Sequence, residues 1–313
     1  MLSTAVMAPG VSGYSVYAKL LMVSFIWGGT FVAGRYIAID MAPLLSACLR
    51  FILASATLIA VLAMRREVFI ALTARQVLAV IALGFFGIFA YNIFFFYGLH
   101  YINASRASLI VALNPALIAL AAFTIGKERL GAGNVMGIGA CIAGAATVIL
   151  SKDAAALQPV AQAWIGDALI LGCVLSWVLY SVCSKNLVRQ IGPLHTVAYS
   201  VIAGTLMLFC AALLHGDITW AAIGNIQQSQ LVSLLYLGVI GSALAYIWYY
   251  DGIQKIGATR SGVFIALNPL SAVVLGLLLL DESLSPPMLL GGLLVISGIY
   301  FSNKPAGTAK VEV

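Results

Sequence analysis

Two asparagine-proline pairs stand inside long apolar runs of this sequence, at Asn114-Pro115 and Asn268-Pro269. Proline has no backbone N–H, so within a helix the carbonyl group four residues earlier loses its partner. At membrane depth such a break persists where other groups satisfy the freed atoms or where it lines a cavity. Pro115 and Pro269 are therefore predicted hinges, and the two asparagine amides are predicted to face a substrate. The alternative is two tolerated kinks, with each asparagine bonded locally.

Aromatic side chains form a second group that could contact a substrate. In helical spacing, Tyr246, Tyr249 and Tyr250 share one face. Such a face suits a planar or apolar substrate through ring stacking, although aromatic residues near helix ends also form interfacial belts. The predicted substrate pathway comprises Trp27, Tyr91, Asn92, Phe95, Asn114, Trp177, Tyr180, Tyr246, Trp248, Tyr249, Tyr250 and Asn268.

Few charged residues lie within the apolar runs. Arg50 lies about six residues inside its run, about 10 Å from the end of a helix. A charge at the bilayer centre costs about 2.5–3.5 kcal/mol on insertion scales, and less where the side chain can extend outward. A functional Arg50 would attract a substrate carboxylate, and His100 is a second candidate for that contact. The structural interpretation of Arg50, in which its side chain extends outward to the interface or bonds to helix-end carbonyl groups, is favoured. Every Asp and Glu lies at or beyond a predicted helix end, which favours uncoupled or weakly coupled transport over proton coupling.

Other kinds of chemistry find little support in the sequence. The three histidines and five cysteines are scattered, so no metal site is expected, and no cofactor motif is present. The nucleotide-binding pattern GxxxxGK[ST] and the hydrolase patterns HExxH and GxSxG are absent, which argues against an enzyme. Lys and Arg do not cluster as they do in nucleic-acid binders, so no nucleic-acid partner is expected.

The composition determines where these residues must be placed. Of 313 residues, 63% are hydrophobic and 8% are charged, whereas a soluble domain carries about 25% charged residues. A helix spans a bilayer with about 20 apolar residues. The sequence predicts an all-α integral membrane protein whose ten transmembrane helices lie near 17–38, 44–64, 77–98, 106–125, 134–150, 164–184, 194–214, 231–252, 261–280 and 288–302.

Charge and internal repetition predict the topology. A cytoplasmic N-terminus places twelve of the 16 Lys and Arg residues on the cytoplasmic side, so both termini are predicted to be cytoplasmic. The segments that start at Leu83 and Leu237 align without a gap at an offset of 237 − 83 = 154, and both contain Ala-Leu-Asn-Pro. Residues 1–150 and 151–313 are thus two predicted five-helix repeats. Because five is odd, the two repeats are inverted relative to each other, an architecture used for alternating access.

The same residues resemble a known family. The first two helices of an EamA domain resemble the pattern formed by Trp27-Gly28-x-x-Phe31, Pro43 and Arg50-Phe51. A second pattern occurs in both halves with the same order and spacing. It reads Ala104, Leu113, Pro115 and Glu128 in the first half, and Ala258, Leu267, Pro269 and Glu282 in the second. This pattern resembles the drug/metabolite transporter superfamily. The resemblance implies a central cavity lined by the first four helices of each repeat, and the chain is similar to bacterial aromatic amino-acid exporters of the YddG type.

We therefore predict a multi-pass transporter of the bacterial inner membrane that exports small amphipathic metabolites. Amino acids are the predicted substrates, and aromatic amino acids are the first candidates among them. A nucleotide-sugar or drug carrier of the same superfamily is the alternative within transport, and a membrane-embedded enzyme is the alternative from another class. The expected partners are the small-molecule substrate and the lipid bilayer. The spacing Gly133-xxx-Gly137 permits close helix packing, either within the monomer or in a homodimer.

Overall fold

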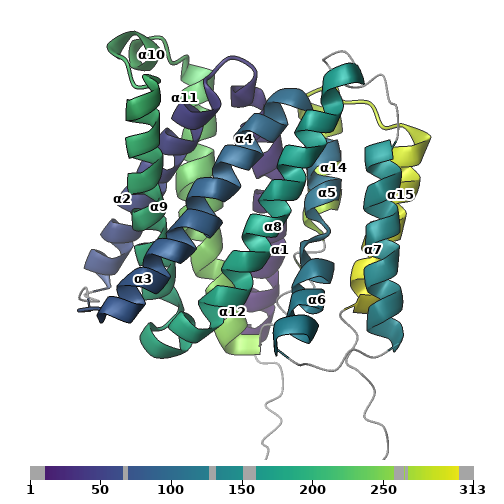
Figure 1. Cartoon of the computed structure of the whole chain (residues 1–313), viewed down its shortest axis with the longest axis horizontal. Coiled ribbons are helices and arrows are strands. Elements are labelled where there is room, and N and C mark those ends of the chain that lie inside the picture. The colour runs from purple at the N-terminus through teal and green to yellow at the C-terminus, as the bar shows by residue number, and fades with distance from the viewer. Residues whose placement is uncertain are drawn as a thin grey trace, which may run out of the picture.

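Helices make up the regular structure of the described chain (Figure 1). The computed structural model describes residues 11–65, 70–126, 132–150, 160–256, 264 and 267–302. The first half contains α1 (Val11–Ala38), α2 (Pro43–Met64), α3 (Ala74–Leu83), the π-helix η1 (Gly84–Ala90), α4 (Tyr91–Tyr101), α5 (Ala104–Val111), α6 (Asn114–Gly126) and α7 (Ala132–Leu150). The second half contains α8 (Val160–Ile191), α9 (Pro193–His215), α10 (Trp220–Gly224), α11 (Gln228–Leu235), the π-helix η2 (Tyr236–Leu244), α12 (Ala245–Ile256), α14 (Asn268–Leu279) and α15 (Pro286–Ser302).

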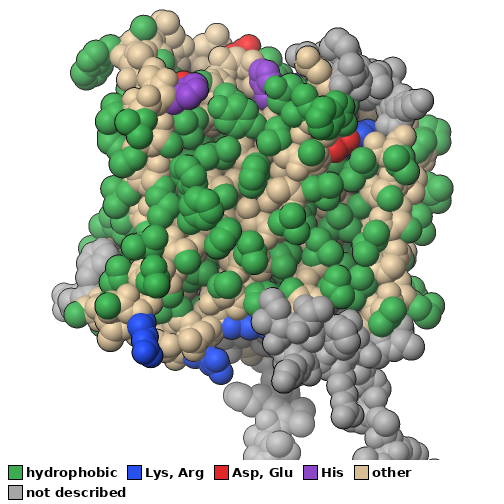
Figure 2. Space-filling view, in the orientation of Figure 1, with side chains coloured by type: hydrophobic (Ala, Val, Ile, Leu, Met, Phe, Trp, Pro, Cys, Tyr) green, Lys and Arg blue, Asp and Glu red, His purple; other side chains and the backbone are tan. Residues whose placement is uncertain are grey.

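These helices have the length and composition of a multi-pass membrane protein. Seven described helices are long and apolar enough to cross a bilayer, and three shorter apolar helices cover Ala104–Ile118, Asn268–Leu279 and Pro286–Phe301. Figure 2 shows apolar side chains over the middle of the molecule, with most of the visible Lys and Arg side chains at the lower edge. The predicted all-α membrane class is thus confirmed. Part of the predicted run 261–280 lies outside the described residues.

Equivalent elements of the two halves adopt the same local structures. Thr73 and Gln76 form a capping box before α3, and Gln227 and Gln230 form the matching box before α11. Both helices then pass into a π-helix, an element found mostly as short insertions and often at functional sites. The π-helices were not predicted, because they leave the apolar pattern of a span almost unchanged.

Some equivalent residues also contact each other directly. The hydroxyl groups of Ser55 on α2 and Thr205 on α9 are hydrogen-bonded at 2.8 Å, and their offset of 205 − 55 = 150 matches the repeat near Trp27 and Trp177. The Cys141 thiol donates to the carbonyl of its equivalent, Val295, at 3.5 Å. Both contacts therefore join equivalent positions of the two halves.

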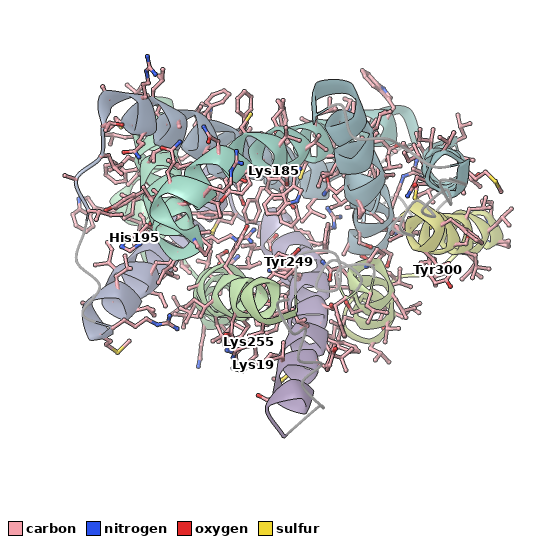
Figure 3. All side chains as sticks on the ribbon, turned by 90° about the horizontal axis from the view of Figure 1, so that it is seen from below. Lys19, Lys185, His195, Tyr249, Lys255 and Tyr300 are labelled. Atoms are coloured by element: carbon pink, nitrogen blue, oxygen red, sulfur yellow. The ribbon has the colours of Figure 1, made fainter. Side chains whose placement is uncertain are left out.

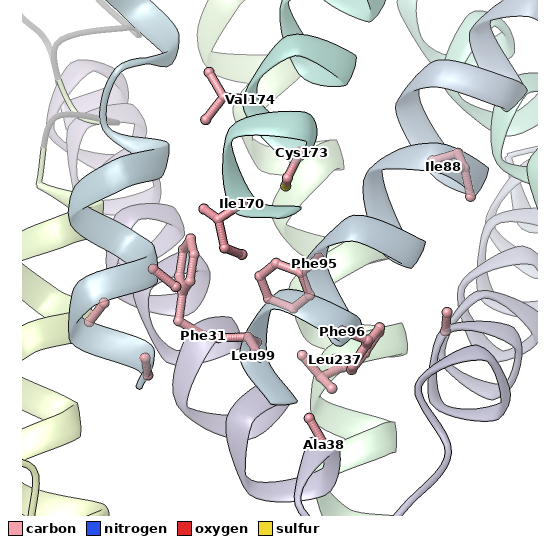
Figure 4. Packing of buried hydrophobic residues seen from close by; sticks show 14 of the residues in the cluster. Phe31, Ala38, Ile88, Phe95, Phe96, Leu99, Ile170, Cys173, Val174 and Leu237 are labelled. Atoms are coloured by element: carbon pink, nitrogen blue, oxygen red, sulfur yellow. The ribbon is translucent and has the colours of Figure 1, made fainter. Parts of the chain in front are cut away.

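Each π-helix packs on the other half of the chain at a glycine. A Cβ atom at Gly84 would lie 2.8 Å from the backbone nitrogen of Gly204 on α9, and one at Gly238 would lie 2.6 Å from the carbonyl oxygen of Arg50 on α2. The second contact brings η2 to Arg50. Residues of α1, α4 and α8 form a buried apolar cluster that includes Phe31, Phe95 and Ile170 (Figure 4).

Helices α7 and α15 form a pair at one edge of the bundle (Figure 1). A Cβ atom at Gly144 would lie 2.6 Å from the Gly291 carbonyl oxygen, and one at Gly291 would lie 2.6 Å from the Gly144 carbonyl oxygen. The small residues of α7 therefore pack within the monomer. By contrast, nothing lies within 4 Å of a Cβ atom at Gly133 or Gly139. The homodimer remains a prediction.

Gly144→Ala should destabilise the protein, because its methyl group would meet backbone on α15. Overpacking of this kind typically costs about 1–3 kcal/mol. The matched control is Gly139→Ala on the same helix, where the space is open. Thermal unfolding in detergent should show a lower Tm for Gly144→Ala only. Equal Tm values for the two variants would contradict the tight packing of α7 on α15.

Candidate functional site

A cavity of about 100 Å³ lies at the centre of the bundle, lined by both halves of the chain. It brings together nine residues of the predicted site: Trp27, Arg50, Tyr91, Asn114, Pro115, Trp177, Tyr246, Asn268 and Pro269. These residues come from α1, α2, α4, α6, α8, α12 and α14.

Each Asn-Pro pair begins a half-helix, and the N-terminal end of that half-helix lies at this cavity. Helix α5 ends at Val111, and α6 begins at Asn114 after a tight turn in which the Leu113 N–H donates to the Ile110 carbonyl at 3.0 Å. In the second half the Leu267 N–H donates to the Phe264 carbonyl at 3.0 Å, and α14 begins at Asn268. The helix break predicted at Asn114-Pro115 is therefore present.

Arg50 is the charged group of the cavity, and its side chain is only 7% exposed. Its Nε donates to the Ser242 hydroxyl at 3.1 Å and its Nη1 donates to the Asn92 side-chain oxygen at 3.2 Å. The Asn92 amide is itself oriented by donation to the Ile88 carbonyl at 2.7 Å. The guanidinium also lies over the ring of Phe95, 5.7 Å from its centroid.

The partners of Arg50 are all neutral in the described part of the chain. None of its described neighbours is an ion-pair partner, and its Nη2 donates no hydrogen bond to a described residue. A buried charge normally requires an opposite charge as well as hydrogen bonds. The guanidinium fork matches a carboxylate in two parallel hydrogen bonds. Arg50 therefore has hydrogen-bonding capacity and a positive charge that the described residues leave uncompensated.

Aromatic rings cover the side of the cavity towards the basic end of the bundle. The equivalent residues Trp27 and Trp177 both face Tyr246, with ring centroids 5.7 and 6.4 Å from it. The Trp27 ring is held by donation from its Nε1 to the Gly241 carbonyl at 3.0 Å. Three further predicted residues extend this group: Tyr249 lies 5.1 Å from Trp27, while Tyr91 and Tyr180 lie 5.6 and 5.4 Å from Trp177.

The remaining predicted residues lie away from the cavity lining. Phe95 is buried behind Tyr91, with ring centroids 6.0 Å apart. Trp248 is partly buried and is absent from the described lining. The side chain of Tyr250 lies outside the described residues. His100 has its Nδ1 2.8 Å from the Ala38 carbonyl oxygen, at the end of α1 that carries Arg35, so it contacts backbone there.

A second cavity of about 270 Å³ lies between α2, α9 and α12, and its described lining includes Arg65, His195, Tyr246 and Asp251. Tyr246 is the described residue that lines both cavities. Figure 3 shows this end from below, with Lys19, Lys185, Lys255 and His195 around it. Asp251 forms ion pairs there with Lys255 at 2.9 Å and with Lys19 at 3.5 Å. We call this second cavity the basic-end vestibule.

At the opposite end of the bundle, polar contacts join the two halves. The Glu282 carboxylate accepts hydrogen bonds from the backbone N–H groups of Ala104 and Ser105, at 2.8 and 3.0 Å, and from the Ser105 hydroxyl. This carboxylate caps the N-terminus of α5 from the segment that follows α14. Nearby, the Arg106 guanidinium and the Asp167 carboxylate form a buried ion pair at 2.7 Å. The sequence paired Glu282 with Glu128, which lies outside the described residues, but did not predict this cap.

Comparison with known proteins agrees with this architecture. The model of the EamA-like transporter family matches residues 15–150 and 164–304. The uncharacterized transporter YyaM of Bacillus subtilis is 28% identical over 289 residues, covering 92% of this chain and 93% of that protein. A probable amino-acid metabolite efflux pump of Escherichia coli K12 is 27% identical, with 90% and 92% covered, and a probable terminal-alkyne amino-acid exporter of Streptantibioticus cattleyicolor is 26% identical, with 74% of each covered.

The fold is shared with a solved structure as well. A crystal structure superposes with a TM-score of 0.65 at 21% identity, covering 90% of this chain and 94% of its own. The match to the EamA-like transporter family identifies the chain as a transporter and not an enzyme, and the all-helical bundle around an internal cavity agrees with that class. The chain belongs to the EamA-like transporter family, within the drug/metabolite transporter superfamily.

Tyr246→Ala should open the central cavity to the basic-end vestibule, because its ring lines both spaces. In a variant without native cysteines, Ser108→Cys places a thiol in the lining of the central cavity. A small methanethiosulfonate reagent should modify that thiol at least about tenfold faster with Tyr246→Ala, a change of about 1.4 kcal/mol in barrier. Trp248→Ala is the control and should leave the rate unchanged. Equal rates in all three proteins would show that Tyr246 does not separate the two cavities.

Proposed function

We propose that this protein exports small amphipathic metabolites by alternating access. The proposed substrates are amino acids, and aromatic amino acids are the first candidates among them. The observation that carries the proposal is Arg50, a buried guanidinium with only neutral hydrogen-bond partners, beside a cavity lined with aromatic rings. A substrate carboxylate would complete the coordination of Arg50. An apolar or aromatic side chain of the substrate would stack on the rings of Trp27 and Trp177.

The overall architecture of the proposal is ten membrane helices in two inverted repeats, residues 1–150 and 151–313. The equivalent capping boxes, the equivalent π-helices and the contacts between Ser55 and Thr205 support it. The two family-model matches support it as well. The end rich in Lys faces the cytoplasm of a bacterium in this proposal, and both termini lie on that side.

The size of the cavity indicates the state in which the substrate is held. A dry cavity of about 150 Å³ is enough to bind benzene, whereas the central cavity holds about 100 Å³. An aromatic side chain therefore enters only when a lining group moves. If Tyr246 swings aside, the central cavity joins the basic-end vestibule of about 270 Å³. In this proposal the structure represents an occluded state, in which Tyr246 is the gate towards the cytoplasm and the Glu282 cap closes the other side.

Export by this cycle is uncoupled or weakly coupled in the proposal. Asp and Glu are absent from the described lining of the central cavity, so the described lining offers no carboxylate for a proton to bind during the cycle. Two relatives, named a probable terminal-alkyne amino-acid exporter and a probable amino-acid metabolite efflux pump, support amino acids as the substrate class. Arg50 is the one cationic side chain of the described lining. It does not match the two phosphate charges of a nucleotide sugar, so this substrate class is the alternative and not the main proposal.

Exchange in proteoliposomes tests this function. Purified protein in liposomes preloaded with unlabelled phenylalanine should take up labelled phenylalanine, and uptake should not depend on a pH gradient. Arg50→Met should lower this exchange at least about tenfold, since a carboxylate loses a charge-assisted partner worth about 1.5–3 kcal/mol. The matched control Arg75→Met, at an exposed position of α3, should exchange as the wild type does.

Two results would contradict the proposal. Absence of exchange with every amino acid in a panel, from wild-type protein that elutes as a single folded species, would rule out the substrate class. Unchanged exchange by Arg50→Met would show that Arg50 is structural, and nucleotide sugars and drugs would become the next panel.

A further inference from the structure

Two buried polar atoms of the central cavity have no hydrogen-bond partner among the described residues. The Oδ1 atoms of Asn114 and Asn268 are both enclosed, and neither accepts a hydrogen bond from a described residue. Across the described chain, Arg35 Nε is the other enclosed side-chain polar atom of this kind. An unsatisfied buried acceptor costs about 1–3 kcal/mol. That two equivalent residues of the repeats both bear this cost, in one cavity, requires an explanation.

Local capping does not provide that explanation. Asparagine at a helix start usually accepts a hydrogen bond from a backbone N–H of the first turn. Asn103 does this at α5, where its Oδ1 accepts from the Arg106 N–H at 2.8 Å. Asn268 instead lies one residue inside its half-helix, after Leu267, and α14 has no side-chain cap. The Oδ1 atoms of Asn114 and Asn268 are therefore available to a ligand, since neither accepts a hydrogen bond from a described residue.

The free atoms define the charge pattern of the ligand. The cavity offers one donor fork, at Arg50, and two unpaired acceptors, at Asn114 and Asn268. An ammonium group has three donors and no acceptor, so it can satisfy both amide oxygens. Helix N-termini attract anions through their free N–H groups, but Pro115 and Pro269 each remove one of these donors. That loss weakens the competing arrangement, in which the carboxylate would lie on the two half-helices.

We propose that Asn114 and Asn268 together bind the ammonium group of the substrate while Arg50 binds its carboxylate, so that the cavity selects free α-amino acids. The inference rests on the proposed function and adds to it the group that each half contributes. Because one asparagine comes from each repeat, a single ammonium group joins the two half-helices. A ligand without an amino group leaves both acceptors unpaired, and a site built this way discriminates strongly against it.

Competition with labelled phenylalanine for purified protein in detergent tests the proposal. The competitors are phenylalanine, 3-phenylpropionate, which lacks the amino group, N-acetylphenylalanine, which blocks it, and phenethylamine, which lacks the carboxylate. Wild-type protein should bind 3-phenylpropionate and N-acetylphenylalanine at least about tenfold more weakly than phenylalanine, or 1.4 kcal/mol. Asn268→Leu and Asn114→Leu should weaken phenylalanine to the level of 3-phenylpropionate and leave 3-phenylpropionate unchanged.

Three controls separate binding from folding. Asn268→Asp keeps an acceptor oxygen in place and should retain the preference for phenylalanine over 3-phenylpropionate. Asn225→Leu, at an exposed position after α10, should change nothing. Without ligand, Asn268→Leu should be as thermostable as the wild type, since it replaces an unsatisfied polar group by an apolar one of similar size.

The outcomes distinguish this inference from the proposed function. Equal binding of phenylalanine and 3-phenylpropionate to the wild type would overturn the ammonium subsite and leave the Arg50 site standing. Equal weakening of both ligands by Asn268→Leu would assign Asn268 a structural role and overturn the subsite as well. Phenethylamine that still binds Arg50→Met, but binds Asn268→Leu at least about tenfold more weakly, would support the subsite independently of Arg50. Failure of every amino acid to bind would overturn both proposals.

Discussion

A guanidinium group held inside a membrane bundle, with no carboxylate beside it among the described residues, is the constraint around which the rest of this structure is arranged. Burial removes most of the water that would otherwise solvate this charge, so protein groups must contact it. Asn92, Ser242 and the ring of Phe95 supply neutral partners, and the π-helix η2 approaches α2 closely enough at Gly238 to bring Ser242 into place. These neutral partners do not compensate the positive charge of Arg50. A substrate anion would provide that compensation.

The repeat explains why this charge occurs once. Position 50 of the first half corresponds to Ser200 in the second, and Ser200 donates to the Val197 carbonyl at 3.1 Å. Trp27 and Trp177, and the two Asn-Pro pairs, are kept in both halves, so aromatic rings and half-helix ends are duplicated around a single cation. Under the proposed alternating access, symmetric parts would allow the cavity to open in two directions. The single charge would give the substrate one orientation in both.

Much of the fold could be predicted from the sequence, because membrane helices are encoded locally by apolar length. The repeat at an offset of 154 and the paired Asn-Pro breaks led to most of the cavity. What could not be predicted depends on contacts between distant segments. Arg50 and Ser242 are 192 residues apart, and Glu282 caps a helix that starts 178 residues earlier. Periodicity contains no signal for either contact.

The same limit applies to side chains that share a helix. Trp248 and Tyr246 are two residues apart in an aromatic stretch, yet only Tyr246 is in the described cavity lining. His100 was a candidate for carboxylate contact from its type alone, and its position at the end of α4 beside the Ala38 carbonyl became visible only in three dimensions. Composition identified these residues as unusual, and helix rotation decided which of them reach the cavity.

The most direct test of the central claim is a structure of the protein determined with phenylalanine bound. The account predicts the carboxylate within hydrogen-bond distance of Arg50, the ring against Trp27 or Trp177, and the ligand inside the central cavity. Ligand density elsewhere in the bundle, with Arg50 still held by Asn92 and Ser242 alone, would contradict the assignment of Arg50 as the substrate receptor.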